Sequence, residues 1–198
     1  KLQYFYLFYT DDLEKSKINI IKSYGESKNY IVLSRKEFVE RIFYPNVYDA
    51  RAKCVGFNLP FDLSRLAIYF GKSRKMHNGF TLRLAENPNL PNIVIKSISR
   101  KASFIEFTKP IRKNSEKRTE HYKGCFVDLK TASFALTNES YTLEKVLENF
   151  ECTAKIKADI HGIINPQYID YNINDTMATY ELYEKCLQRY KLYNLTNE

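Results

Sequence analysis

Strand-like segments alternate with segments of helical periodicity along this chain of 198 residues. Short runs rich in aromatic and β-branched residues are typical of strands, and four of them lie at 2–10, 30–33, 52–57 and 125–129. Helical patterns follow, the clearest behind the capping box Ser34-x-x-Glu37. Strands that alternate with helices predict an α/β fold.

Turn and cap residues set the expected limits of these elements. Segment 25–29 predicts a turn, and 18–24 before it fits either a strand or a short helix. Pro45 predicts the end of the helix behind Ser34. Asn58 followed by Pro60 predicts a helix with a side-chain cap, which we expect to extend to Ile68.

The C-terminal part of the chain is predicted to be helical. A short helix is expected after the strand at 125–129, up to Leu136, and a second one has an apolar face that ends at Phe150. Asn165 followed by Pro166 is a helix start, and we expect that last helix to continue to about Tyr193.

All of the excess positive charge lies in one internal segment. Residues 71–123 hold 13 Lys/Arg and 4 Asp/Glu, a net of +9, whereas the other 145 residues hold 18 and 19, a net of −1. Two interpretations stay open: a solvated surface, or an arm that contacts phosphates. Three alternating stretches predict an antiparallel insertion that makes the sheet mixed, at 79–85, 92–98 and 102–108.

Composition excludes several classes of protein. With 44% hydrophobic and 27% charged residues the chain is not disordered, collagen-like or a coiled coil. No apolar run approaches the roughly 18 residues that a membrane span needs. We expect one domain over 1–198 that carries an insertion at about 71–123. The opening KLQYFYLFYT has no features of a signal peptide, and we expect a longer protein to continue upstream.

The cysteines and histidines do not form a metal-binding pattern. No two of the four cysteines (Cys54, Cys125, Cys152 and Cys186) form a C-x-x-C pair, which favours a reducing compartment and a cytoplasmic location. The three histidines are isolated from one another. A metal site would therefore consist of carboxylates, which suit Mg²⁺ or Mn²⁺.

Two carboxylates stand in patterns that suggest chemistry. Asp62 follows Asn58-x-x-Phe61 where a strand passes into a helix, and Asp175 follows Tyr171 by four residues in the last helix. That spacing puts Tyr171 and Asp175 on one helical face, and Ala178 and Leu182 continue the face as an inward stripe. An inward carboxylate needs a partner, and a divalent cation is one. The alternatives are a solvated first-turn Asp62 and a surface or salt-bridged Asp175.

The two patterns resemble motifs of one nuclease family. The run from Val55 to Leu63 is similar to the second motif of DnaQ-like (DEDD) 3′–5′ exonucleases, and 171–175 is similar to the third motif of their tyrosine-type branch. Histidine-type members carry His five residues before the last Asp, where this chain has Asp170. With further segments, the chain resembles the exonuclease domain of bacterial proteins similar to family-B DNA polymerases; these segments are 34–40, 127–131, 161–162 and 168–171.

The resemblance implies a ribonuclease-H-like fold and two-metal hydrolysis of phosphodiester bonds at the 3′ ends of DNA, as in proofreading. Four carboxylates then hold two Mg²⁺ or Mn²⁺ ions roughly 3.5–4 Å apart. By resemblance, Asp62 and Asp175 are metal ligands and Tyr171 orients the attacking water. Asn58 holds the second motif or touches the substrate, and Phe61 stacks near terminal bases or packs in the protein. Asp128 is expected as a helix cap or as a partner of a ligand.

One motif of the family is not found at its place. Its first motif, Asp-x-Glu, supplies two of the four carboxylates, and this chain has that pattern only at Asp12-Leu13-Glu14. We expect the true motif to precede Lys1; the alternatives are that Asp12 and Glu14 serve the role or that the site is degenerate. Accordingly, an inactive nucleic-acid-binding module and an RNA-trimming exonuclease stay open beside a DNA exonuclease within a polymerase-like protein.

If the basic segment contacts phosphates, neutralising Lys and Arg in 71–123 weakens binding to DNA and flattens its dependence on salt. Each lost phosphate contact is expected to reduce the slope of log K against log salt by about 0.7–0.9. Binding titrations at several NaCl concentrations measure this slope, and an unchanged slope would remove the segment from the DNA interface.

Overall fold

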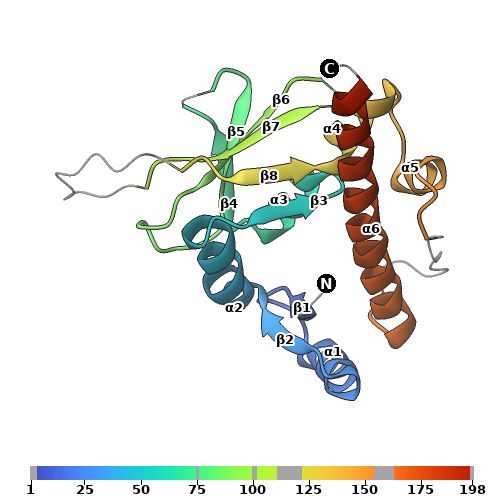
Figure 1. Cartoon of the computed structure of the whole chain (residues 1–198). Helices are drawn as coiled ribbons and strands as arrows, with labels where there is room; N and C mark the ends of the chain where they lie inside the picture. Colours follow the sequence, from blue (N-terminus) through green and yellow to red (C-terminus); the bar gives the residue numbers. More distant parts are fainter. Residues whose placement is uncertain (1–3, 75, 100–101, 111–121, 154–162, 197–198) are drawn as a thin grey trace.

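The computed structural model describes residues 4–74, 76–99, 102–110, 122–153 and 163–196 (Figure 1). Its strands form three sheets: the parallel pair β1–β2, the parallel pair β3–β8, and an antiparallel sheet in the order β4-β5-β6-β7. The predicted mixed α/β class is confirmed. In the described part of the chain, no helix is both long and apolar enough to cross a bilayer.

The N-terminal unit consists of β1 (Tyr6–Tyr9), α1 (Lys15–Lys28) and β2 (Ile31–Ser34). The two strands pair in parallel from Tyr6 opposite Ile31 to Tyr9 opposite Ser34. Ile21 and Tyr24 of α1 form a small core with Ile169 of the last helix. This unit therefore packs against the first turns of that helix, at the lower end of Figure 1.

A helical segment crosses from the N-terminal unit to the antiparallel sheet. It comprises α2 (Arg35–Phe38), with the predicted Ser34–Glu37 capping box, and the π-helix η1 (Val39–Asp49). The prediction that Pro45 ends this helix is wrong. Proline has no amide hydrogen to donate, and the wider turn of η1 accommodates it: the Ala50 amide donates to the Pro45 carbonyl, five residues back, at 2.9 Å.

The antiparallel sheet contains β4 (Tyr69–Lys72), β5 (Gly79–Arg83), β6 (Ile93–Ser97) and β7 (Ser103–Phe107). One of its faces covers the largest core, where Phe107 lies against Phe43 and Tyr44 of η1. The three predicted strands are present, but β4 was not predicted: the expected helix reached Ile68, whereas α3 ends at Leu66, and residues 69–72 were assigned to no element. The prediction that this insertion makes the sheet mixed is wrong, because the antiparallel strands form a sheet of their own that is not joined to β3–β8 in one ladder. The Phe107 amide of β7 donates to the Lys123 carbonyl before β8, at 2.7 Å.

The remaining elements surround the second parallel pair. They are β3 (Lys53–Gly56), α3 (Leu59–Leu66), β8 (Cys125–Asp128), α4 (Leu129–Thr137), α5 (Leu143–Asn149) and α6 (Pro166–Thr196). Helix α6 packs on α4 and β3, and its buried residues Ala178 and Leu182 share a core with Leu129 and Val146 (Figure 1).

A predicted boundary near the end of α1 is also wrong. The turn predicted at 25–29 is part of α1, which ends at Lys28 with Asn29 in the left-handed conformation as its C-cap. Gly25 is buried within α1, where the helix packs closely on Val32 of β2. A side chain would not fit at this position, since an added Cβ would lie 2.3 Å from Val32 Cγ2. This glycine therefore serves the packing of α1 on β2 rather than a turn.

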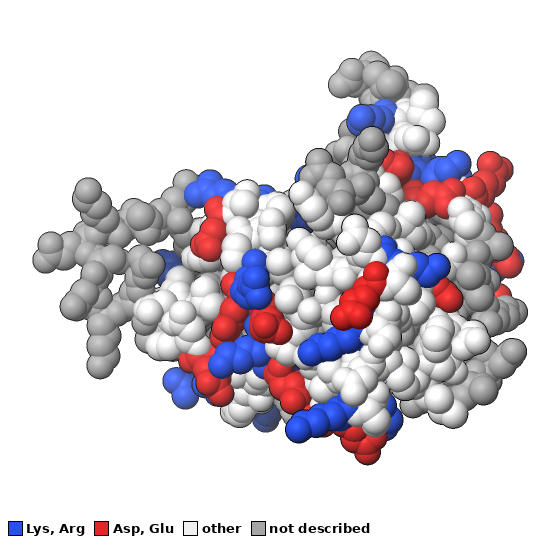
Figure 2. Space-filling view, turned by 90° about the horizontal axis from the view of Figure 1, so that it is seen from below, with Lys and Arg blue, Asp and Glu red and all other residues white. Residues whose placement is uncertain are grey.

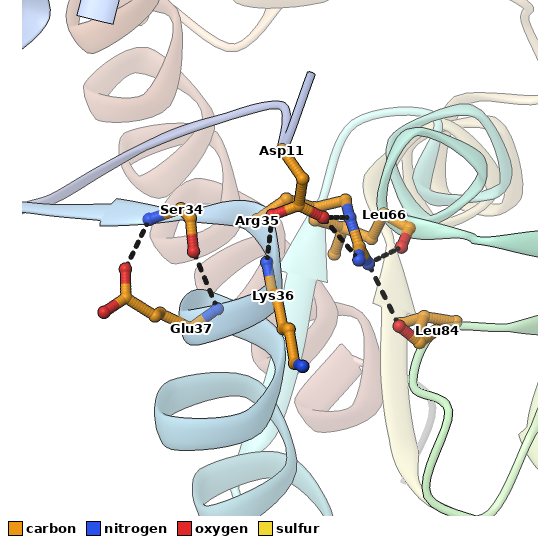
Figure 3. A network of polar contacts seen from close by, with 7 residues as sticks. All are labelled: Asp11, Ser34, Arg35, Lys36, Glu37, Leu66 and Leu84. Atoms are coloured by element: carbon orange, nitrogen blue, oxygen red, sulfur yellow. Dashed lines mark hydrogen bonds and ion pairs between the residues drawn. The ribbon is translucent and has the colours of Figure 1, made fainter. Parts of the chain in front are cut away.

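One arginine joins three parts of this fold (Figure 3). Arg35 donates from Nε and Nη2 to the Asp11 carboxylate, each at 2.7 Å. Its Nη1 donates to the carbonyl of Leu66 at the end of α3 and to that of Leu84 just after β5, at 2.9 and 3.0 Å. The Lys36 amide donates to the other oxygen of Asp11 at 3.0 Å. A single guanidinium thus connects the N-terminal unit, α3 and the antiparallel sheet.

We expect Arg35→Lys to destabilise the protein by about 2–4 kcal/mol, because an ammonium group cannot make the forked bonds and two carbonyls would lose their donor. Arg41→Lys is the matched control, since Arg41 is an exposed neighbour paired with Glu37 at 3.8 Å; its cost should stay below about 0.5 kcal/mol. Urea unfolding measures both values. Equal stability of the two variants would contradict the role given to Arg35.

Candidate functional site

The candidate site lies where the parallel strands β3 and β8 end. Their register places Gly56 opposite Asp128, so that both carboxyl ends stop at the same level. Helix α3 starts three residues after β3, and α4 starts directly after Asp128. Ligands in α/β proteins commonly bind at the carboxyl ends of parallel strands, where helix starts and loops gather.

Asp62 lies in the first turn of α3, and its carboxylate points back to the end of β3. A Cβ added at Gly56 would lie 3.2 Å from Asp62 Oδ2 and 2.8 Å from Leu59 Cδ2. The absence of a side chain at Gly56 therefore leaves the space that the carboxylate uses. The residue as a whole is exposed, but its carboxylate is packed against the strand end.

Asp128 connects the two helix starts. Its Oδ1 accepts a hydrogen bond from the Leu59 amide at 3.1 Å, and its Oδ2 accepts one from the Thr131 hydroxyl at 2.7 Å. The first bond caps α3 from a different strand, and the second holds the first turn of α4. The expectation that Asp128 acts as a helix cap is confirmed, and the helix that it caps is α3.

Asp62 and Asp128 form the acidic pair of the site. Burial, and secondly the negative charge of Asp128, raise the pKa of Asp62 from its ordinary 3.8 to about 6. Burial raises the pKa of the neighbouring Cys54 thiol to about 12, and the charge of Asp62 adds to this shift. Negative charge at this point is therefore costly, which is the condition that a bound cation would relieve.

Asn58 lacks the side-chain cap that the sequence predicted, and Phe61 is not packed in a core. Asn58 adopts the left-handed conformation, with φ 66°, and its side chain makes no capping bond; Pro60 has no amide hydrogen, and the Phe61 amide donates to the backbone carbonyl of Asn58 at 2.9 Å. The predicted side-chain cap is wrong. Phe61 is 51% exposed rather than packed in a core, and the Arg65 guanidinium lies 4.5 Å from its ring centroid. The exposed ring leaves one surface of the second motif available for contact.

Tyr171 and Asp175 lie on α6, and within the described part of the chain Asp175 does not form with Asp62 and Asp128 a group of three acidic side chains close enough to hold a metal ion. Both residues of α6 are half-buried, and Tyr171 stacks with Tyr168 at a centroid distance of 6.4 Å. The predicted inward stripe is confirmed, because Ala178 and Leu182 are buried in the core that also contacts Val55 at the end of β3. Asp170 points elsewhere: it accepts a hydrogen bond from the Tyr24 hydroxyl of α1, and burial and this carboxylate raise the pKa of Tyr24 to about 12.

The acidic residues could hold a cation only as part of a larger set. Among the described residues, no group of three or more His, Cys, Asp or Glu lies close enough together to hold a metal ion. Asp12 is exposed, and Glu14 pairs with Lys17 at 3.2 Å at the start of α1. The residues present thus fit part of a carboxylate site, with Asp62 as the side chain whose electrostatics favour a cation most clearly.

The basic segment is described only in part. Six of its 13 basic residues belong to the described residues: Lys72, Arg74, Arg83, Lys96, Lys109 and Lys123. The other seven lie outside the described residues, and so do residues 111–121. On the face in Figure 2, Lys and Arg alternate with Asp and Glu, so that face carries no uniform positive field.

Comparison of the chain with family models, with curated protein sequences and with solved structures finds no match. The function is therefore argued from the site and from the resemblance of its motifs.

Asp62→Asn should stabilise the protein at pH 8 and leave its stability unchanged at pH 4. Because folding raises the pKa of Asp62, the folded state favours the protonated acid. The wild-type protein therefore has this contribution to its stability in full below about pH 4 and loses it as the pH rises through 6, whereas the amide of the Asp62→Asn variant stays uncharged throughout. We expect a gain of about 1 kcal/mol at pH 8, since solvent screens a partly exposed carboxylate. Thermal unfolding across this pH range measures it.

The matched control for this experiment is Asp12→Asn, which changes an exposed acid outside the pair. A gain for Asp62→Asn that is the same at pH 4 and pH 8, or equal to that of the control, would contradict the electrostatic description of the site.

Proposed function

We propose that this protein is a metal-dependent 3′–5′ exonuclease of the DnaQ-like, tyrosine type, which shortens DNA from its 3′ end. The observation that carries the proposal is the Asp62 carboxylate at the carboxyl ends of β3 and β8, with its pKa raised to about 6 by burial and by Asp128. A nuclease with carboxylate-bound metal needs such acidic groups at one edge of a sheet. The proposal includes a ribonuclease-H-like fold, for which the mixed α/β architecture is a compatible framework.

In this proposal Asp62 and Asp175 are the residues of this chain that would hold Mg²⁺ or Mn²⁺. The bound ions supply a water of lowered pKa and charge stabilisation at the phosphate. The chain's own residues do the positioning: Asp128 holds the start of α3 and so the direction of Asp62, and Gly56 leaves room for its carboxylate. Tyr171 orients the attacking water rather than acting as its general base.

The substrate contacts follow from what the second motif exposes. Phe61 presents a half-exposed ring, which can stack on a terminal base, and Arg65 beside it can contact a phosphate. Asn58 fixes the turn before α3 through its left-handed backbone, a conformation that Asn tolerates better than most residues. The proposed setting is proofreading beside a polymerase domain of the same protein.

A second candidate function is a nucleic-acid-binding module that keeps the fold without catalysis. It is favoured by the observation that no group of three or more metal-ligating side chains lies together in the part of the chain that the structure describes. An exonuclease that trims RNA shares the proposed metals and fold, and differs in its contacts to the 2′-hydroxyl group.

Asp175→Asn is expected to abolish metal-dependent shortening of 5′-labelled single-stranded DNA while DNA binding stays largely intact. Asp170→Asn is the matched control, because Asp170 lies on the same helix but bonds to Tyr24 of α1. Tyr171→Phe should lower the rate by up to about 10²-fold through a misplaced water. Gel analysis of the full-length protein with Mg²⁺ or Mn²⁺ measures all three.

Two results would contradict the proposal. Cleavage that persists in Asp175→Asn would show that the third motif is assigned wrongly. Binding of DNA without shortening under either metal would favour the inactive module.

A further inference from the structure

The outward face of the antiparallel sheet differs in character from its inward face. Side chains alternate between the two faces of a strand. Leu82, Ile93 and Phe107 point into the core, and each is at most 2% exposed. The strand register therefore assigns the opposite face to a different set of side chains, among them Tyr69, Arg83, Lys96 and Phe104.

This outward face presents aromatic rings to solvent at two corners. Tyr69 is 61% exposed and Phe104 is 63% exposed. They lie on the two outer strands, β4 and β7, with β5 and β6 between them. Val94, in the middle of the same face, is only 3% exposed, so the exposed part of this face is at its two corners. Exposed aromatic rings on an antiparallel sheet are the kind of surface on which nucleobases stack.

The ring of Tyr69 lies along its own strand rather than pointing away from it. A Cβ added at Gly71 would lie 3.2 Å from Tyr69 Oη and 3.3 Å from Cε1, so the ring covers the place where a side chain of residue 71 would stand. Gly71 is two residues further along β4 and shares the same face. The ring is thus held against the sheet at the strand edge, and most of its surface stays open.

Positive charge accompanies both rings. Arg83 lies directly opposite Tyr69 in the ladder, with its guanidinium 5.7 Å from the ring centroid, and Lys96 lies directly opposite Phe104. The acid on this face, Glu106, pairs with Lys123 at 3.3 Å. The charges that remain beside the rings are therefore basic, and they complement a phosphate backbone.

We propose that this face, Tyr69–Arg83–Lys96–Phe104, binds single-stranded nucleic acid, with a base stacked on Tyr69 and phosphates beside Arg83 and Lys96. The proposal rests on the proposed function in taking nucleic acid as the partner. Only Ala67 and Ile68 separate β4 from α3, the helix that carries Asp62. Nucleic acid bound on this face would therefore lie on a β-strand that is directly connected to α3, the helix of the second motif.

The test measures binding of a fluorescein-labelled oligothymidylate by anisotropy, in EDTA so that cleavage cannot occur. Tyr69→Ala should weaken binding about 5- to 150-fold, the range expected for one lost base–aromatic stack. Tyr69→Phe should bind within about twofold of wild type because the ring remains. Far-UV circular dichroism checks that each variant folds.

Phe70→Ala is the matched control. Phe70 is the next residue on the same strand and is 76% exposed, but it lies opposite Leu82 and so belongs to the other face. Its removal should change affinity less than twofold. A loss with Phe70→Ala equal to that with Tyr69→Ala, or unchanged binding by Tyr69→Ala, would overturn the proposal.

Further probes distinguish RNA from DNA as the ligand. They also distinguish failure of the proposed binding face from failure of the proposed exonuclease activity. An oligouridylate of equal length shows whether RNA or DNA binds better. No binding to either single strand, or binding to duplex DNA that is equally tight and insensitive to Tyr69, would overturn the platform. Tyr69-dependent binding without cleavage under any metal supports the platform and rejects the exonuclease; metal-dependent cleavage with Tyr69-independent binding does the reverse.

Discussion

Arg35 places one guanidinium among three separate parts of the chain: the Asp11 turn, the end of α3 and the end of β5. Its side chain is 13% exposed, so these bonds form largely away from water, where an unmatched carbonyl or carboxylate is costly. Each of the two parallel pairs has only two strands, too few to be stable alone. Their mutual placement, and with it the position of α3, therefore depends on this contact together with the apolar cores.

In the candidate site, too, one charged side chain bonds to more than one element. One carboxylate, Asp128, bonds to the first amide of α3 and to the first turn of α4, and its charge adds to the rise that burial causes in the pKa of Asp62. The arrangement thus fixes a second carboxylate in a place where its ionised form is disfavoured. Charged groups whose ionised form is destabilised by their surroundings are common at functional sites. A ligand of opposite charge removes this free-energy cost when it binds, and its affinity is higher for that reason.

Local sequence patterns predicted which segments form helices and strands better than they predicted where these elements end and what they contact. The capping box at Ser34 and the inward stripe of Ala178 and Leu182 depend on nearby residues, so the sequence contained them. Gly25 and Pro45 misled because tertiary packing and a π-helix accommodate them inside helices. The capping of α3 by Asp128 bridges 69 positions, a separation that no local pattern reports.

The most direct test of the proposed metal site is whether divalent ions bind through Asp62 and Asp175. Mn²⁺ binding to the full-length protein can be followed by electron paramagnetic resonance in wild type, Asp62→Asn, Asp175→Asn and the double variant. We expect each single variant to bind Mn²⁺ more weakly than wild type and the double variant to bind it most weakly, because each carboxylate is a ligand of the proposed two-ion site. Wild-type Mn²⁺ binding in either single variant would contradict the proposed site.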